Sequence, residues 1–361
     1  MVMQLSIITI NYNDATGLKK TLDSVAAQTY PHIQHIIVDG GSTDGSVEII
    51  REYADNQAKG ERLEVEGAEY GEADTLASTL YTLHSTPSKH HVLWVSEKDS
   101  GIYNAMNKGL EIALGKRIVN DDHTSSPIAN GQSPIAQTDY IQILNAGDIL
   151  AAPDVTERMV DALAHQCKGT ANECKVESVK CKGGENGAAE MNMPYRLENC
   201  PAIFYGNMTK VNAAGQVVGK SGYTEYSLRQ FYSSTLNHDC AYIRKDLFEE
   251  YGLYDENLKI VSDWKWYLQA IGLGRVKPEY VDIDVTIFDA GGISETNLEL
   301  RNKERRQVLE ELLPPAVLWD YDQHAFEVEQ VNRLRRWHLY PLVYFMERVL
   351  FKLEKWGVLK R

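Results

Sequence analysis

Two apolar runs near the start of the chain, each followed by a helical pattern, constrain its fold most. Residues 5–10 and 33–38 are continuous and rich in β-branched side chains, as expected of strands buried on both faces. Apolar residues at helical spacing follow each run, with Leu18, Leu22 and Val25 after the first. This order of strand, helix, strand and helix predicts an α/β fold with a parallel sheet and right-handed crossovers.

The second run ends at Asp39 and leads into a glycine-rich loop, residues 40–45. The loop lacks the Gly-x-Gly-x-x-Gly pattern of dinucleotide-binding enzymes, which argues against a dehydrogenase. Taken alone, Asp39 is explained equally well as the cap of a tight turn.

Residues 96–148 contain the densest group of chemically informative residues. A polar loop carrying Asp99 leads into a helix expected to end near Gly115, and a short apolar strand later stops at a turn carrying Asp148. In open α/β sheets, ligands bind beyond the carboxyl ends of the strands. The two carboxylates should therefore share one edge, where they suit a divalent cation and a phosphorylated ligand.

Composition excludes several classes of protein. The 361 residues carry a net charge of −14, which disfavours nucleic acid as a partner because a phosphate backbone attracts a basic surface. Five cysteines, an odd number, favour a reduced setting. Residues 1–10 are expected to form a strand and not a signal peptide, and no apolar run reaches the roughly 18 residues of a membrane span. We therefore expect a cytoplasmic protein.

Two segments resemble the core of the family 2 glycosyltransferases, which have the GT-A fold. They are Ser-Glu-Lys-Asp-Ser-Gly-Ile-Tyr-Asn-Ala-Met-Asn-Lys-Gly at 96–109 and Leu-Asn-Ala-Gly-Asp at 144–148. They are most similar to a bacterial subgroup that builds surface polysaccharides and glycolipids. The resemblance covers about two-thirds of the chain. It implies a Rossmann-like, mostly parallel mixed sheet flanked by helices, with a helical C-terminal extension.

The resemblance also implies a nucleotide site. The side chains expected to contact the nucleotide are Thr9, Tyr12, Asp39, Asp99, Asn107, Lys108 and Asn145. By the same resemblance Asp148 binds a divalent cation, Mg²⁺ or Mn²⁺, that clamps the departing diphosphate. Asn145 stands where the family usually has a first aspartate, so this position can still bind ribose or a metal-bound water but lacks charge.

Further family segments occur in the second half of the chain. The run Asn-His-Asp at 237–239 resembles the family segment that closes the sugar pocket, so His238 is a candidate contact for the donor phosphates or the acceptor. Ser262 and Asp263 match the start of the helix that carries the catalytic base. Ser262 is expected to cap that helix, and Asp263 to lie in its first turn and remain ionised. Asp255 is the alternative base.

The expected domains are a catalytic domain, 1–297, and a helical extension, 298–361. Insertions are expected at about 57–90, 116–139 and 165–195. Cys167, Cys174 and Cys181 lie in or beside the last one at a seven-residue spacing that does not suit zinc, so we expect an exposed segment.

Residues 331–361 carry eight Lys and Arg residues and two Glu, and their apolar residues share one helical face. A basic amphipathic helix of this kind favours peripheral contact with the inner face of the cytoplasmic membrane. Packing against the catalytic domain or a second subunit explains the pattern equally well.

The sequence thus favours an inverting, metal-dependent glycosyltransferase. It would move a sugar from a UDP- or GDP-sugar to a hydroxyl of a glycan or lipid-linked acceptor during cell-surface polysaccharide synthesis. A sugar-1-phosphate nucleotidyltransferase is one alternative, although residues 11–13 lack the glycine-rich basic loop expected there. A non-catalytic scaffold of a polysaccharide-assembly complex is the other. Metal-dependent nucleotide binding separates these cases.

Overall fold

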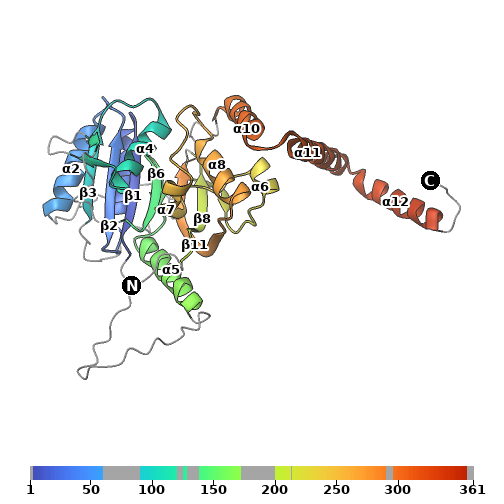
Figure 1. Cartoon of the computed structure of the whole chain (residues 1–361), viewed down its shortest axis with the longest axis horizontal. Helices are drawn as coiled ribbons and strands as arrows, with labels where there is room; N and C mark the ends of the chain where they lie inside the picture. Colours follow the sequence, from blue (N-terminus) through green and yellow to red (C-terminus); the bar gives the residue numbers. More distant parts are fainter. Residues whose placement is uncertain are drawn as a thin grey trace, which may run out of the picture. The chain divides into compact units, whose positions relative to one another are not determined.

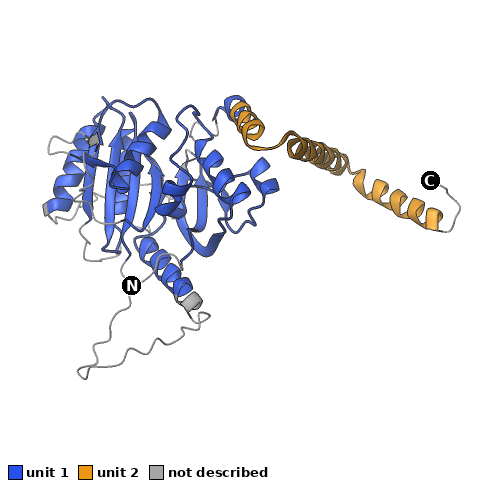
Figure 2. Ribbon diagram, in the orientation of Figure 1, with its two compact units in different colours: residues 1–301 blue, residues 302–361 orange. Residues whose placement is uncertain are grey.

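The computed structural model describes residues 3–59, 90–119, 125–127, 138–171, 200–212, 214–289 and 296–355. The chain divides into two compact units, Met1–Arg301 and Asn302–Arg361 (Figure 2). The domain boundary that the sequence predicts between residues 297 and 298 stays a prediction. Most of the three predicted insertions lies outside the described residues.

The first unit is built on a mixed sheet with strand order β3-β2-β1-β6-β10-β8-β11-β7, and β9 pairs with β8. A separate short pair is formed by β4 and β5. The strands are β1 Leu5–Asn11, β2 Ile33–Asp39, β3 His91–Ser96, β4 Arg117–Val119, β5 Ser125–Pro127, β6 Tyr140–Asn145, β7 Ile149–Leu150, β8 Ile203–Val211, β9 Val217–Ser221, β10 Ala241–Arg244 and β11 Pro278–Asp289.

The first half of the sheet is parallel, which confirms the predicted α/β class. β1 lies between β2 and β6 and runs parallel to both, while β3 extends the sheet beyond β2 (Figure 1). In this register Asn11 is opposite Asp39, and Asp39 is opposite Ser96. Ile10 is opposite Asn145. The carboxyl ends of four strands therefore meet at one edge, and the loops that follow them are neighbours.

Helices cover both faces of this sheet. α1 (Ala15–Ala26), α2 (Ser46–Lys59) and α5 (Val155–Ala171) contribute to the cores on one face. α4 (Ile102–Ala113) packs against β1 and β2, and its Gly109 lies against Ile8. The remaining helices of this unit are short: α6 Leu228–Ser233, α7 Asp246–Glu250, α8 Ser262–Tyr267 and the π-helix η3 Leu268–Leu273.

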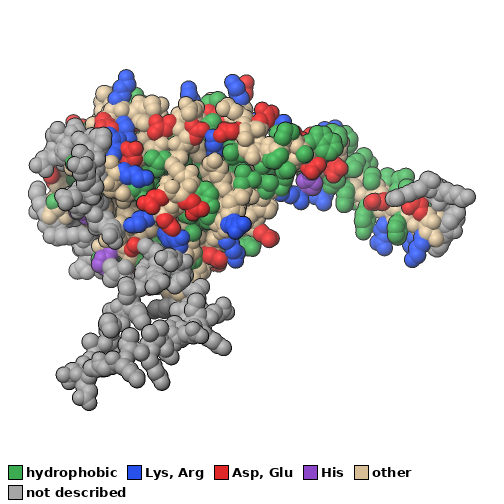
Figure 3. Space-filling view, in the orientation of Figure 1, with side chains coloured by type: hydrophobic (Ala, Val, Ile, Leu, Met, Phe, Trp, Pro, Cys, Tyr) green, Lys and Arg blue, Asp and Glu red, His purple; other side chains and the backbone are tan. Residues whose placement is uncertain are grey.

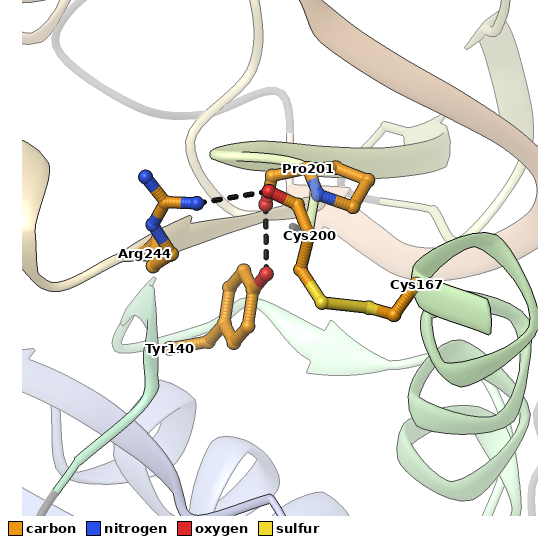
Figure 4. Close-up of a disulfide and its surroundings, with 5 residues drawn as sticks. All are labelled: Tyr140, Cys167, Cys200, Pro201 and Arg244. Atoms are coloured by element: carbon orange, nitrogen blue, oxygen red, sulfur yellow. Dashed lines mark hydrogen bonds between the residues drawn. A yellow bond between two sulfur atoms is a disulfide. The ribbon is translucent and has the colours of Figure 1, made fainter. Parts of the chain in front are cut away.

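The expectation that residues from 165 onward form an exposed segment is wrong at Cys167. α5 continues to Ala171, and Cys167 is buried in the core and forms a disulfide with Cys200 (Figure 4). The adjacent backbone is also held, because Arg244 donates to the carbonyl of Cys200. The disulfide also differs from the reduced cysteines that the odd cysteine count favoured. The count could not reveal this pair, because the pairing depends on contacts between residues distant in sequence.

The second unit contains the rest of α10 (Leu298–Leu312), α11 (Pro315–Arg336) and α12 (Tyr340–Lys355). α10 ends before Pro314 and α11 begins at Pro315, because proline cannot continue a helix but is tolerated in its first turn. No residue of α12 is buried. Within the described residues, no helix is both long and apolar enough to cross a bilayer.

The close approach of α4 to β1 leads to a stability prediction. A Cβ at Gly109 would collide with the Ile8 side chain. Gly109→Ala should therefore lower the free energy of unfolding by about 1–3 kcal/mol, although alanine favours helix formation. Chemical denaturation measures this loss. Equal or greater stability of the variant would contradict the observed helix–sheet packing.

Candidate active site

The glycine-rich loop after β2 is organised by Asp39. Its buried carboxylate accepts hydrogen bonds from the Asn11 amide at 2.8 Å and the Ser42 hydroxyl at 2.6 Å. It also accepts from the Ser96 hydroxyl at 2.7 Å and from the backbone N–H groups of Gly41 and Ser42. The bonds observed at Asp39 therefore fix the loop, and its contact with a nucleotide base stays a prediction.

Thr9 and Tyr12 lie in very different environments. The Thr9 hydroxyl is fully buried and bonded to His35 Nε2 at 2.9 Å. The Tyr12 ring is 66% exposed beside Gly40, where it is free to stack on a flat ligand. Sequence reasoning missed Asn11, the last residue of β1, which lies between these loops and directly contacts Asp39.

Asp99 lies beside the same glycine-rich loop. A Cβ at Gly40 would come within 2.5 Å of Asp99 Oδ2, so the two loops touch. Burial raises the pKa of Asp99, although its carboxylate accepts a hydrogen bond from the Gly101 N–H at 3.0 Å. The structure thus brings Asp99 together with Asp39 and Tyr12.

Two residues of α4 that are predicted to contact the nucleotide, Asn107 and Lys108, bond other parts of the protein. Both ends of the Asn107 amide bond the backbone of Tyr254, and its Nδ2 also donates to Glu256 at 2.8 Å. Lys108 Nζ lies 3.0 Å from a carboxylate oxygen of Glu97 and donates to the Lys98 carbonyl. The predicted nucleotide contacts of both side chains remain untested.

The turn after β6 places Asp148 at the same edge of the sheet. Gly147 has a φ of +101°, a conformation that glycine adopts without strain, and it lets the chain reverse. Asp148 Oδ2 accepts from the Asn145 backbone N–H at 3.0 Å and from its amide Nδ2 at 3.2 Å. Burial, together with the neighbouring Asp239, raises the pKa of Asp148 well above its usual range.

His238 connects this turn to α8. Its Nδ1 lies 3.3 Å from Asp263 Oδ2, and its Nε2 lies 3.3 Å from Asn145 Nδ2. Burial alone would lower the pKa of His238, but the bond to Asp263 and the charges of Asp263, Asp239 and Asp148 raise it to about 9. A neutral imidazole accepts from the Asn145 amide, whereas an imidazolium favours the reversed amide with its oxygen facing the ring.

Asp263 is half-buried in the first turn of α8, as predicted. Burial alone would raise its pKa, but His238 and the Tyr103 hydroxyl, which donates at 2.7 Å, keep it below the usual range. The predicted Ser262 cap is wrong, because the helix begins after Val261 and no side chain caps it. The carboxylate of Asp255, the alternative base, is paired with Lys265 at 2.9 Å.

The donor set around Asp148 fits a divalent cation shared with a diphosphate. Among the described residues, no group of three or more His, Cys, Asp and Glu side chains is arranged to hold a metal ion alone. However, Asp148 and Asp239 are neighbouring buried carboxylates, and in the amide orientation that donates to His238 the buried Asn145 Oδ1 has no hydrogen-bond partner. One or two carboxylates completed by substrate phosphates are typical of magnesium sites.

The pairing of His238 with Asp263 predicts a pH-dependent contribution to stability. Because folding raises the pKa of His238, the charged ring stabilises the folded protein fully below the unfolded-state pKa of 6.5. This stabilisation disappears as the pH rises through the folded-state pKa of about 9. The difference in melting temperature between wild type and His238→Gln should therefore be largest near pH 5–6.5 and decline towards pH 10. Thermal unfolding followed across this range measures the difference. A constant difference would mean that the ring is held by packing and not by charge.

Comparison with known proteins gives consistent matches. The family model described as glycosyl transferase family 2 matches residues 6–68, which contain β1, the Asp39 loop and α2. An uncharacterized glycosyltransferase of Mycobacterium tuberculosis is 25% identical over 269 residues, covering 74% of this chain and 68% of that protein. A PGL/p-HBAD biosynthesis glycosyltransferase of Mycobacterium bovis is 21% identical over 292 residues, covering 81% and 79% respectively.

Among solved structures, Staphylococcus aureus TarS is similar over 86% of this chain, with 13% identity and a TM-score of 0.47. This chain spans 42% of that TarS chain. The family model and the curated relatives together support a family 2 glycosyltransferase.

Proposed function

We propose that this glycosyltransferase inverts the anomeric configuration of the sugar that it transfers. The donor is a nucleoside diphosphate sugar, with uridine or guanosine as the nucleoside. The acceptor is a hydroxyl of a glycan or lipid-linked glycan in bacterial cell-surface polysaccharide synthesis. The observation that carries the proposal is the linked group Asp148, Asn145, His238 and Asp263, which sets a candidate base beside a candidate diphosphate site.

The loops at the carboxyl ends of β1, β2 and β3 would hold the nucleoside. Tyr12 offers an exposed aromatic face for stacking on the base. Asp99 and Asp39 offer carboxylate oxygens for base or ribose hydrogen bonds once the loop adjusts to the ligand. Thr9 would support this pocket from beneath through its bond to His35.

Asp148 and Asn145 would hold the divalent cation together with the donor diphosphate. When bound, such a cation neutralises the charge that develops on the departing diphosphate. The raised pKa of Asp148 indicates a buried carboxylate whose charge is poorly compensated in the ligand-free protein. A cation at this position would favour the ionised form.

Asp263 would act as the general base. The acceptor oxygen attacks the anomeric carbon on the face opposite the diphosphate, and the hydroxyl proton passes to an Asp263 carboxylate oxygen. The bond between the anomeric carbon and the diphosphate oxygen breaks, so the configuration inverts. His238 and Tyr103 keep Asp263 ionised for this step because both stabilise its charged form.

Transfer assays with a panel of nucleotide-sugars, run with Mn²⁺ or with a chelator, test the mechanism. Asp263→Asn should lower kcat by about 10²–10⁴-fold, because general-base catalysis contributes on that scale. Asp148→Ala should make nucleotide binding insensitive to Mn²⁺. Release of one nucleoside diphosphate identifies the donor, and NMR of the product gives the anomeric configuration.

Asp255→Asn is the matched control, because it makes the same chemical change in a carboxylate paired with Lys265. If Asp255→Asn loses transfer and Asp263→Asn does not, the general base is Asp255. No turnover of any donor, with nucleotide binding also absent, would favour the scaffold alternative.

The tail would attach the enzyme to a membrane where a lipid-linked acceptor is found. α12 presents exposed apolar side chains, including Leu342, Phe345 and Met346, and it also carries Arg348 and Lys352. Figure 3 shows hydrophobic and basic side chains together on the tail helices. A helix with this composition suits the headgroup region of an anionic bilayer, here the inner face of the cytoplasmic membrane.

Vesicle flotation tests the membrane contact. Deleting residues 331–361 should abolish binding to vesicles that contain anionic lipid, and Phe345→Asp in the full chain should weaken it. Full-length protein should bind neutral vesicles less, because each basic residue near an anionic surface contributes about 1 kcal/mol. Unchanged binding after the deletion would refute the proposal, and a change from dimer to monomer would assign the apolar face to a second copy.

A further inference from the structure

The catalytic motif at 96–109 contributes a side chain that the nucleotide site does not use. Tyr103, in the first turn of α4, is 4% exposed, and its hydroxyl donates to Asp263 Oδ1 at 2.7 Å. The two residues are 160 positions apart in sequence, on helices of opposite halves of the first unit. A buried phenol hydroxyl usually has a hydrogen-bond partner, and for Tyr103 that partner is the candidate base.

The same helix also holds the segment that leads into α8. The Asn107 amide bonds both the N–H and the carbonyl of Tyr254. The amides of Asn104 and Asn107 each donate to one carboxylate oxygen of Glu256 at 2.8 Å. α4 is therefore attached to the segment that carries Asp263 at three points, Tyr254, Glu256 and Asp263. These contacts together fix the distance between Tyr103 and Asp263.

The two oxygens of Asp263 are held from different sides. Oδ1 accepts from Tyr103, and Oδ2 faces His238 Nδ1. A carboxylate has about four lone-pair sites, so each oxygen can still accept another hydrogen bond. His238 also faces the diphosphate side through Asn145, whereas Tyr103 bonds only the base among these groups. Tyr103 can thus restrain the orientation of the carboxylate independently of His238.

We propose that Tyr103 is a positioning residue that orients the Asp263 carboxylate toward the acceptor hydroxyl. The inference rests on the proposed function, because it requires Asp263 to be the base. The reacting oxygens must approach within a narrow geometry, and a misplaced base slows proton transfer without weakening donor binding.

Tyr103→Phe tests the inference with the full-length enzyme, the donor identified by the panel, and Mn²⁺. Rates are divided by the concentration of nucleotide-binding sites, so that misfolded protein does not contribute. We expect kcat for transfer to fall about 10- to 100-fold. The donor KM and the nucleotide Kd should stay within about twofold, because Tyr103 makes no bond on the nucleotide side.

Tyr254→Phe is the matched control. The Tyr254 ring packs against Tyr103 with centroids 5.7 Å apart, and its buried hydroxyl has no hydrogen-bond partner. Removing that oxygen deletes the same atom from the neighbouring ring without touching Asp263. This variant should keep the wild-type kcat.

The pH profile separates positioning from a structural role. Loss of a donor to the ionised carboxylate raises the pKa of Asp263, so the acidic limb of kcat should move to higher pH in Tyr103→Phe. The other titratable side chains near Asp263 are His238, Tyr254 and Tyr267, and all are retained in this variant.

Two results would overturn the inference in distinguishable ways. If Tyr103→Phe matches Tyr254→Phe in kcat and in the acidic limb while Asp263→Asn is inactive, the base stands and Tyr103 does not position it. If Asp263→Asn retains full transfer, the base assignment fails and the role of Tyr103 fails with it.

Discussion

Burial of several carboxylates around one imidazole is the constraint on which the candidate site depends. Asp148 and Asp239 are nearly inaccessible, Asp263 is half-buried, and all three act on the pKa of His238. Burying a charge is costly unless it is paired and hydrogen-bonded. Asp263 has two such partners, which keep its pKa below the usual range, whereas burial and the neighbouring Asp239 raise the pKa of Asp148 despite the Asn145 donors and the charge of His238. Asp148 is thus a carboxylate whose ionised form the ligand-free protein stabilises poorly, at the position where the cation and diphosphate are proposed to bind.

α4 connects the two halves of the first unit. Its apolar side packs on β1 and β2, where Gly109 permits a close approach, and its polar side chains reach the segment before α8. The side chains of the motif therefore divide between different tasks. Lys108 and Asn107 bond the backbone at Lys98 and Tyr254, Tyr103 contacts the candidate base, and Asp99 lies beside the glycine-rich loop.

The two units differ in how they treat apolar surface. The first buries its aliphatic side chains against the sheet. α12 leaves large apolar residues such as Phe345 and Phe351 more than half exposed. Exposed apolar area of this kind is unfavourable in water, which supports the proposed contact of the tail helix with an anionic surface.

The sequence by itself determined the fold class, because buried parallel strands need continuous apolar runs and the crossover helices need an apolar face. The resemblance of its motifs to those of family 2 glycosyltransferases also predicted Asp148 and Asp263 as members of the candidate site. Only the tertiary structure decided which side chains meet. It paired Tyr103 and His238 with Asp263, joined Cys167 to Cys200 and gave the Thr9 hydroxyl to His35. Such pairings join residues far apart in sequence, so they depend on the strand register and on how helices pack, which a local pattern does not encode.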